Sequence, residues 1–271
     1  MKKHRQSLLG QIERKGVADP KCHMARLLLD KYESLLASIE TCNVEDVCKR
    51  YSKYYDFFDS MDAGKVFSAQ TKVRPTILEE LVERCLIPKF EHHLGGALES
   101  NGLKYGACKA YCNLYFKPES LASFLEGPSI NCVEKDQDFA VYAPLALGIH
   151  GQSRSLNIPF FAVECKTYVD KTMLSGIAAT AQAIKSGNPY CRFVVVCEEW
   201  EVSNDTDPAL SMIDEIYVLR KSRRTKGDST RSALQPDVLK AYVQEAIEHL
   251  RATWSNVNES LNISGKLIGS R

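Results

Sequence analysis

The sequence predicts an α/β protein with a helical segment in front of its sheet. Residues 6–59 carry apolar residues at helical spacing. Two short apolar runs, residues 158–165 and 191–197, are typical of buried strands, and the second is rich in β-branched residues. Residues 172–185 lie between these runs and have a helical pattern. Strands that alternate with helices indicate the α/β class.

The first part of the chain is predicted to be a helical subregion, residues 1–65, of a single domain spanning residues 1–271. Asn43 begins one of its helices as an N-cap, because its short polar side chain can accept a bond from the first turn. Residues 51–58 hold five aromatic side chains, which we expect to pack between helices. The catalytic core is expected over residues 66–255, and residues 256–271 form a polar tail.

The remaining elements follow from local signals in chain order. Pro75 suits the first turn of a helix over residues 76–87, which Pro88 is expected to end. Strands are predicted at residues 140–148 and 158–165, with a turn at residues 151–155 between them. After the helix at 172–185 come strands at 191–197 and 213–219 and a last helix at 236–254.

Composition narrows the class of protein. The chain has 271 residues, 44% of them hydrophobic, and a formal net charge of +1, so no global basic field marks it as a binder of polyanions. No apolar run is long enough for a membrane span, and no apolar signal core follows the basic N-terminus. The ten cysteines lack zinc-finger or Cys-x-x-Cys spacing, which favours free thiols in a reducing cytoplasm. We therefore expect a soluble cytoplasmic protein.

One charged pair stands out at the end of a predicted strand. Glu164 and Lys166 are two residues apart, so in a strand they share one face, roughly 7 Å apart along the backbone. Asp138 precedes another apolar run, and Asp136 lies two residues earlier on the same face. We prefer Asp138 because the apolar strand begins directly after it. Charges at such positions are rarely buried without a use.

These residues are the minimal set for hydrolysis of a phosphodiester with a divalent metal ion. Mg²⁺ prefers oxygen ligands and keeps several waters, so Asp138, Glu164 and the backbone carbonyl of Cys165 could suffice to bind it. The metal serves as Lewis acid and template. Lys166 would then lie beside the attacking water, orienting it or stabilising the developing charge.

The pattern Asp138 followed by Glu164-Cys165-Lys166 resembles the PD-(D/E)xK nuclease superfamily. The surrounding segments, residues 67–81, 135–141 and 163–174, resemble type II restriction endonucleases, in particular the BbvCI-like enzymes that cut an asymmetric site with two different subunits. The resemblance covers about residues 65–220. It implies a mixed central sheet flanked by helices and a Mg²⁺-dependent, sequence-specific endonuclease that leaves 5′-phosphates. It also implies a prokaryotic source.

The resemblance implies further features of the site. One active site per chain cuts one strand of double-stranded DNA, so a double-strand break needs a second, identical or homologous, subunit. Some members add a helical glutamate, for which Glu80 is preferred here and Glu79 is the alternative. Gln137 stands where the superfamily name has a proline, a position that varies in such enzymes.

Basic residues near these segments are candidates for contacting DNA. Residues 219–231 contain six basic residues and one acidic residue, with glycine and hydroxyl residues that indicate a loop. Two candidates flank the helix start at Pro75, and one lies on the turn between the two predicted catalytic strands. The candidates are Lys72, Arg74, Arg154, Arg220, Lys221, Arg223 and Arg224.

Other functions remain open at this point. A nicking or repair nuclease with the same core would carry the same residues, whereas a catalytically silent DNA-binding subunit would be expected to lose one of them. A nucleotide-binding α/β enzyme would need a glycine-rich loop between a strand and a helix, and the glycines at 148 and 151 do not fit that pattern.

Overall fold

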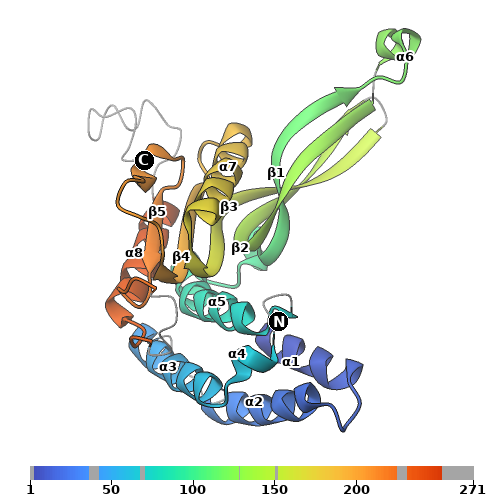
Figure 1. Ribbon diagram of the computed structural model, residues 1–271. Helices are drawn as coiled ribbons and strands as arrows, with labels where there is room; N and C mark the ends of the chain where they lie inside the picture. The colour runs from blue at the N-terminus through green and yellow to red at the C-terminus, as the bar shows by residue number, and fades with distance from the viewer. Residues whose placement is uncertain are drawn as a thin grey trace, which may run out of the picture.

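The computed structural model describes residues 3–36, 43–67, 71–127, 129–149, 152–224 and 231–251. Within these ranges a block of helices lies below a sheet, and one end of the sheet extends far from the body (Figure 1). The elements are α1 Lys3–Arg14, α2 Pro20–Leu36, α3 Val44–Ser60, α4 Ala63–Val66, α5 Val73–Leu94, η2 Glu99–Asn101, β1 Lys104–Lys117, α6 Leu121–Glu126, β2 Ser129–Ile149, β3 Gln152–Val169, α7 Lys171–Gly187, β4 Arg192–Trp200, η3 Pro208–Leu210, β5 Glu215–Val218 and α8 Pro236–Arg251.

The described strands form one mixed sheet of five strands in the order β1-β2-β3-β4-β5. β1, β2 and β3 are antiparallel neighbours, whereas β4 and β5 run parallel to β3. Parallel neighbours need a long crossover, and α7 supplies it between β3 and β4. The predicted α/β class with a mixed central sheet and an N-terminal helical extension is therefore confirmed.

β2 and β3 stop pairing with each other in the middle of the sheet. Their pairing begins at Phe139 opposite Val163 and continues to the hairpin end. Before Phe139, β2 pairs only with β1, and after Val163, β3 pairs only with β4. A register shift in the β1–β2 ladder coincides with this point, because Gly106 pairs with Ala140 but Cys108 pairs with Gln137. We call the place where the two strands separate, at residues 138 and 164, the fork.

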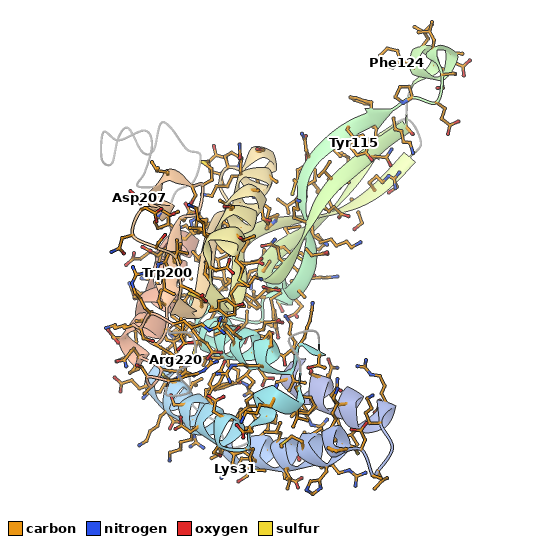
Figure 2. The ribbon with its side chains drawn as sticks, in the orientation of Figure 1. Lys31, Tyr115, Phe124, Trp200, Asp207 and Arg220 are labelled. Carbon is orange, nitrogen blue, oxygen red and sulfur yellow. The ribbon has the colours of Figure 1, made fainter. Side chains whose placement is uncertain are left out.

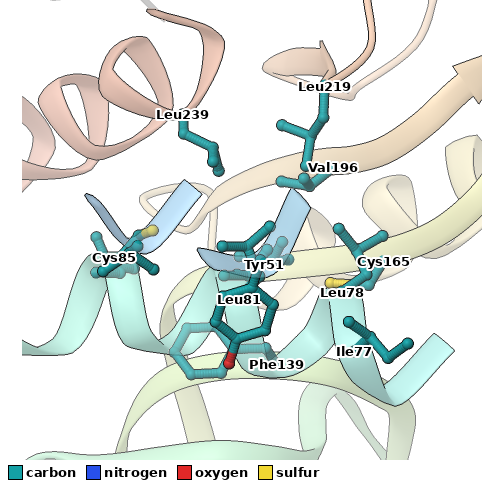
Figure 3. Close-up of a cluster of buried hydrophobic side chains, with 14 of the residues drawn as sticks. Tyr51, Ile77, Leu78, Leu81, Cys85, Phe139, Cys165, Val196, Leu219 and Leu239 are labelled. Atoms are coloured by element: carbon teal, nitrogen blue, oxygen red, sulfur yellow. The ribbon is translucent and has the colours of Figure 1, made fainter. Parts of the chain in front are cut away.

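Two cores hold the sheet on its opposite faces. The larger core joins α2, α3, α5 and α8 to one face of the sheet, where α5 places Leu78 and Leu81 near Phe139 and Cys165 (Figure 3). The smaller core lies under α7 and includes Ala162, Val195 and Cys197 of the other face. Burying apolar surface at roughly 25 cal/mol per Å² is the main term that stabilises such layers.

The end of α7 approaches β1 so closely that only glycine fits there. A Cβ on Gly187 would lie 1.9 Å from the backbone oxygen of Cys112. This contact fixes α7 across the sheet between β3 and β1. Because α7 begins directly after the Glu-x-Lys strand, its N-terminus lies beside the end of β3.

Several sequence-based expectations are confirmed and others need correction. Asn43 caps α3 by accepting a hydrogen bond from the Glu45 N–H, and the aromatic side chains Tyr51, Tyr54, Tyr55 and Phe58 are buried. The helix expected to end at Pro88 instead runs on to Leu94 and ends at Gly95, which adopts φ 70°. Pro88 removes one helical hydrogen bond, but Phe90 beyond it is fully buried and holds the helix on the core.

The strands β2, β3 and β4 are longer than the predicted apolar runs, β5 is shorter than the predicted 213–219, and β1 was not expected. β1, β2 and β3 extend together into an arm that carries α6 at its tip, and Figure 2 shows Tyr115 and Phe124 on this arm, far from the body. Most of the arm is exposed, so its strands lack a clear apolar alternation. The turn expected at residues 151–155 is shorter, because β3 already begins at Gln152. Residues 225–230 of the basic loop and the tail 256–271 lie outside the described residues.

The described helices include none that is both long and apolar enough to cross a membrane. The nine cysteines within the described ranges are free thiols.

Candidate active site

Asp138 lies on β2 at the fork, and its carboxylate reaches across to β3. Oδ2 accepts a hydrogen bond from the backbone N–H of Cys165 at 2.9 Å and another from Lys166 Nζ at 3.2 Å. The Cys165 N–H lies beyond the last β2–β3 backbone pair, so the Asp138 side chain occupies the position that a neighbouring strand would otherwise take. The fork therefore fixes this carboxylate against the Glu-x-Lys strand.

Glu164 and Lys166 complete the group. Lys166 Nζ lies 2.5 Å from Glu164 Oε1, so one ammonium group bridges the two carboxylates. Burial raises the pKa of Glu164, and the nearby Asp138 raises it further, against the opposing effect of Lys166. Burial alone would lower the pKa of Lys166, but Asp138 and Glu164 outweigh it and raise that pKa. Lys166 is therefore a cation at neutral pH.

The donors at the fork have the chemistry that a hard divalent cation requires. Both bonds to Asp138 use Oδ2 and the bond to Glu164 uses Oε1, so within the described residues Oδ1 and Oε2 of these two side chains carry no hydrogen bond. Carboxylate and carbonyl oxygens are the ligands that Mg²⁺ prefers. In the described ranges, no group of three or more His, Cys, Asp or Glu side chains is positioned to hold a metal. A metal here would rest on two carboxylates, backbone oxygen and water.

Glu80, the preferred candidate for a helical glutamate at this site, does not face the fork. Its carboxylate is buried and fully used inside the helical block, where it accepts bonds from Tyr32, Tyr51 and Arg84 and from the His4 backbone N–H. The alternative, Glu79, faces Asp138 instead. Burial raises the pKa of Glu79, and the negative charge of Asp138 raises it further. Consecutive helix residues point about 100° apart, so only one of the two can face the fork.

A residue that the sequence analysis did not single out also reaches the fork. Lys3, the first residue of α1, donates to Glu79 Oε2 at 2.9 Å and to the backbone oxygen of Asp138. Nothing in the local sequence signals this role, because the contact spans the whole N-terminal block. Asp136, by contrast, is exposed on the β1–β2 part of the sheet, opposite Lys109.

Two of the candidates for contacting DNA lie in an ionic cluster, in which Arg220 is buried and Arg74 is partly buried. Glu198 is fully buried on β4, and its Oε2 accepts bonds from Arg74 at 2.9 Å and from Arg220 at 3.0 Å. Arg231 adds a third cation at 3.3 Å. Figure 2 shows Arg220 at the junction of the sheet with the N-terminal helices. Arg74 and Arg220 are therefore held in an ion-pair cluster with Glu198, and a contact of either residue with DNA stays a prediction.

The other basic candidates are distributed over three places. Arg154 lies on β3 in the arm, not on a turn, and donates to the Ile130 backbone oxygen. Lys72 is exposed at the start of α5, close enough to lower the pKa of Glu79. Lys221 and Arg223 line a cavity of about 820 Å³ beside β5, which does not include the fork residues.

Arg224 has the most direct relation to the fork. Its guanidinium lies 3.8 Å from the ring centre of Tyr168 and donates to Glu201 Oε2 at 3.1 Å. Tyr168 follows Lys166 by two residues on β3, so alternation puts the two side chains on one face, about 7 Å apart along the strand. The sequence could have indicated Tyr168 from this spacing.

Two comparisons with known proteins found a match. The model of the Bpu10I restriction endonuclease family matches residues 70–258, a range that contains Asp138, Glu164 and Lys166 but not Lys3. A solved structure described as the native BbvCI A2B2 tetramer at low resolution is 20% identical and has a TM-score of 0.65, with 92% of this chain and 96% of that chain covered. No curated protein matches. The family implies a divalent metal cofactor. This chain belongs to the Bpu10I restriction endonuclease family and is a type II site-specific endonuclease.

Proposed function

We propose that this subunit cuts one strand of double-stranded DNA at a specific sequence with Mg²⁺, through Asp138, Glu164 and Lys166, and leaves a 5′-phosphate. One observation carries the proposal. At the fork, two carboxylates and an ammonium group from neighbouring strands converge, with Lys166 Nζ within 3.2 Å of Asp138 and 2.5 Å of Glu164. All three residues are present, which argues against a catalytically silent subunit.

Asp138 and Glu164 would hold the Mg²⁺ ion, and the backbone carbonyl of Cys165 would add a ligand. When bound, the ion supplies Lewis-acid polarisation of the scissile phosphate and lowers the pKa of a bound water. The oxygen-only donor set of the fork supports this assignment, because it suits a hard cation. The hydrogen bond from the Cys165 N–H keeps the Asp138 carboxylate in place while its other oxygen is used.

Lys166 acts as a fixed positive group and not as a general base. Its pKa is raised by the two carboxylates, so the ammonium group stays protonated at neutral pH. A cation at this position can orient the attacking water and stabilise the negative charge that develops on the phosphate. Glu164 must be ionised to act as a ligand, and burial makes that ionisation harder than in an ordinary glutamate.

We further propose that Arg224 contacts the phosphate next to the scissile one. Its guanidinium stacks on Tyr168, two residues beyond Lys166, and a third of its side chain is exposed. The separation along β3 is about 7 Å, on the scale of neighbouring phosphates on one DNA strand. An arginine stacked on an aromatic ring is well suited to phosphate recognition, because the N–H donors of its planar guanidinium are held in a fixed arrangement. The exposed Lys72, beside Glu79, is a second candidate.

A second subunit is needed for a double-strand break, because the proposal gives each chain one active site. The similar BbvCI structure is described as an A2B2 tetramer, which supports assembly with homologous subunits. The proposal includes a location in a prokaryotic cytoplasm.

The test is digestion of a sequenced supercoiled plasmid with the full-length chain and Mg²⁺, followed by mapping of the ends. The proposal predicts cuts at one recurring sequence and 5′-phosphate ends. Nicked circles from the chain alone, and linear product after a partner subunit is added, would support one active site per chain. No Mg²⁺-dependent cleavage in either case would overturn the proposal.

A further inference from the structure

Lys3 brings a cation from the start of the chain into the fork. Its Nζ lies 2.9 Å from Glu79 Oε2 and also donates to the backbone oxygen of Asp138. The side chains of Lys3 and Glu79 are only 19% and 12% exposed, so this pair is largely removed from solvent. Most surface lysines are screened by water, whereas this one is held between α5 and β2.

The rest of α1 fixes Lys3 in this position. The next residue, His4, is fully buried, with Nε2 2.7 Å from the Tyr54 hydroxyl and Nδ1 3.0 Å from the Thr76 hydroxyl. The His4 backbone N–H, which has no partner within its own helix, donates to Glu80 Oε2 at 3.2 Å. Neighbouring residues of α1 thus bind neighbouring residues of α5. The docking of His4 against α5 therefore places Lys3 next to Glu79.

The charges at the fork nearly balance because of Lys3. The carboxylates of Asp138, Glu164 and Glu79 carry three negative charges, and Lys166 and Lys3 supply two positive ones. Burial and Asp138 raise the pKa of Glu79, and Lys3 opposes both. Without Lys3, Glu79 would be a poorly solvated carboxylate beside Asp138, and a second divalent cation would be the natural replacement for the missing charge.

We propose that Lys3 is a built-in cation of the catalytic centre, which neutralises Glu79 and thereby limits each chain to one divalent metal ion. This inference rests on the proposed metal site at Asp138 and Glu164. It concerns a residue outside the 70–258 range matched by the family model, so it is a feature of the N-terminal block of this chain.

The experiment counts Mn²⁺ ions bound to the full-length chain by electron paramagnetic resonance titration. Wild type is expected to bind one ion per chain. Lys3→Met, which removes the charge and keeps an unbranched side chain one atom shorter, is expected to bind a second ion and to bind the first at least about tenfold more tightly. Arg5→Ala is the matched control, because Arg5 lies on the same helix in an exposed pair with Glu33, and it should bind as wild type does.

Two further variants keep the test decisive if Lys3→Met does not fold. Glu79→Gln is expected to change Mn²⁺ affinity by less than about threefold, because the ion pair with Lys3 already neutralises the Glu79 carboxylate in wild type. Lys3→Met/Glu79→Gln should return to one ion. The proposal is overturned if wild type binds two ions, if Lys3→Met binds as wild type does, or if Glu79→Gln alone weakens binding tenfold or more. A wild-type chain that binds no Mn²⁺ would overturn the metal site itself.

Discussion

Asp138 on β2 accepts a hydrogen bond from the backbone N–H of Cys165 on β3 at 2.9 Å, at the point where the two strands separate. A side chain thus replaces the backbone ladder at this point, and this fixes the carboxylate within reach of Lys166, whose ammonium group also contacts Glu164. With one contact, the fork gives the Cys165 N–H an acceptor and positions the carboxylate that we propose as a metal ligand. Its position in the middle of the sheet gives it rigid support from both cores.

Removal of either charged residue of the Glu-x-Lys strand should abolish cleavage and leave DNA binding intact. Lys166→Ala and Glu164→Ala each remove a group that acts on the developing charge or its counter-ion, so we expect a rate loss of about 10³-fold. Single-turnover cleavage in Mg²⁺ and gel-shift binding in Ca²⁺ measure the two properties separately. Lys171→Ala, which removes an exposed lysine at the start of α7, is the control and should cleave normally. Normal cleavage by both variants would contradict the assignment of Glu164 and Lys166 to the active site.

Arg224 should be coupled to one particular phosphate. We expect Arg224→Ala to lower cleavage of natural DNA by roughly tenfold, as for the loss of one charge-assisted hydrogen bond. DNA with a neutral methylphosphonate at the phosphate next to the scissile one should lower wild-type cleavage similarly but have little further effect on Arg224→Ala. Arg154→Ala, on the arm, should show no such coupling. If no phosphate on either side of the cut couples to Arg224, the proposed contact is wrong, although the metal site would stand.

Loss of Glu198 should destabilise the fold. Glu198→Ala would leave Arg220 as a buried cation without its carboxylate partner, while Arg74 would keep Asp59, and breaking such a group costs about 3–5 kcal/mol of the free energy of unfolding. Urea denaturation followed by circular dichroism measures this change. Glu248→Ala, at an exposed site of α8, should change stability by less than about 0.5 kcal/mol. Equal stability of the two variants would show that the cluster is not structural.

Stability should fall in mild acid because of His4. Burial lowers the pKa of His4 from its ordinary 6.5 to about 4, so the unfolded chain binds a proton over this range that the folded chain does not. The contribution of neutral His4 is full above pH 6.5 and is lost as the pH falls toward 4. Between pH 7 and pH 5 this amounts to about 2 kcal/mol. His4→Gln should lack this part of the pH dependence, whereas His23→Gln, on the exposed side of α2, should keep it. Identical slopes for wild type and His4→Gln would contradict the buried neutral state.

Strand alternation was enough to predict the centre of the site. Glu164 and Lys166 share a face because they are two residues apart, and Asp138 lies within β2 directly before the first residue that pairs with β3, so all three meet at one place. The choice between Glu79 and Glu80 could not be made in this way. It depends on the rotation of α5, which the tyrosines and arginine around Glu80 set from other helices.

The basic residues show the limits of charge as a guide. Arg74 and Arg220 lie in polar, loop-like sequence, yet Glu198 draws both into the interior from the end of a buried strand. The contact of Arg74 with Glu198 joins residues 124 positions apart, and the contact of Lys3 with Asp138 joins residues 135 positions apart. The strand β1 was not predicted for a different reason. Few of its residues are buried, so its sequence has no apolar alternation.

The central claim is that Asp138, fixed at the fork, is the metal-binding aspartate. The most direct measurement is the single-turnover rate of Mg²⁺-dependent cleavage by Asp138→Asn and by Asp136→Asn, each with the same assembled enzyme and DNA. We predict a loss of about 10³-fold for Asp138→Asn and a rate within about threefold of wild type for Asp136→Asn. Full activity of Asp138→Asn together with an inactive Asp136→Asn would contradict it.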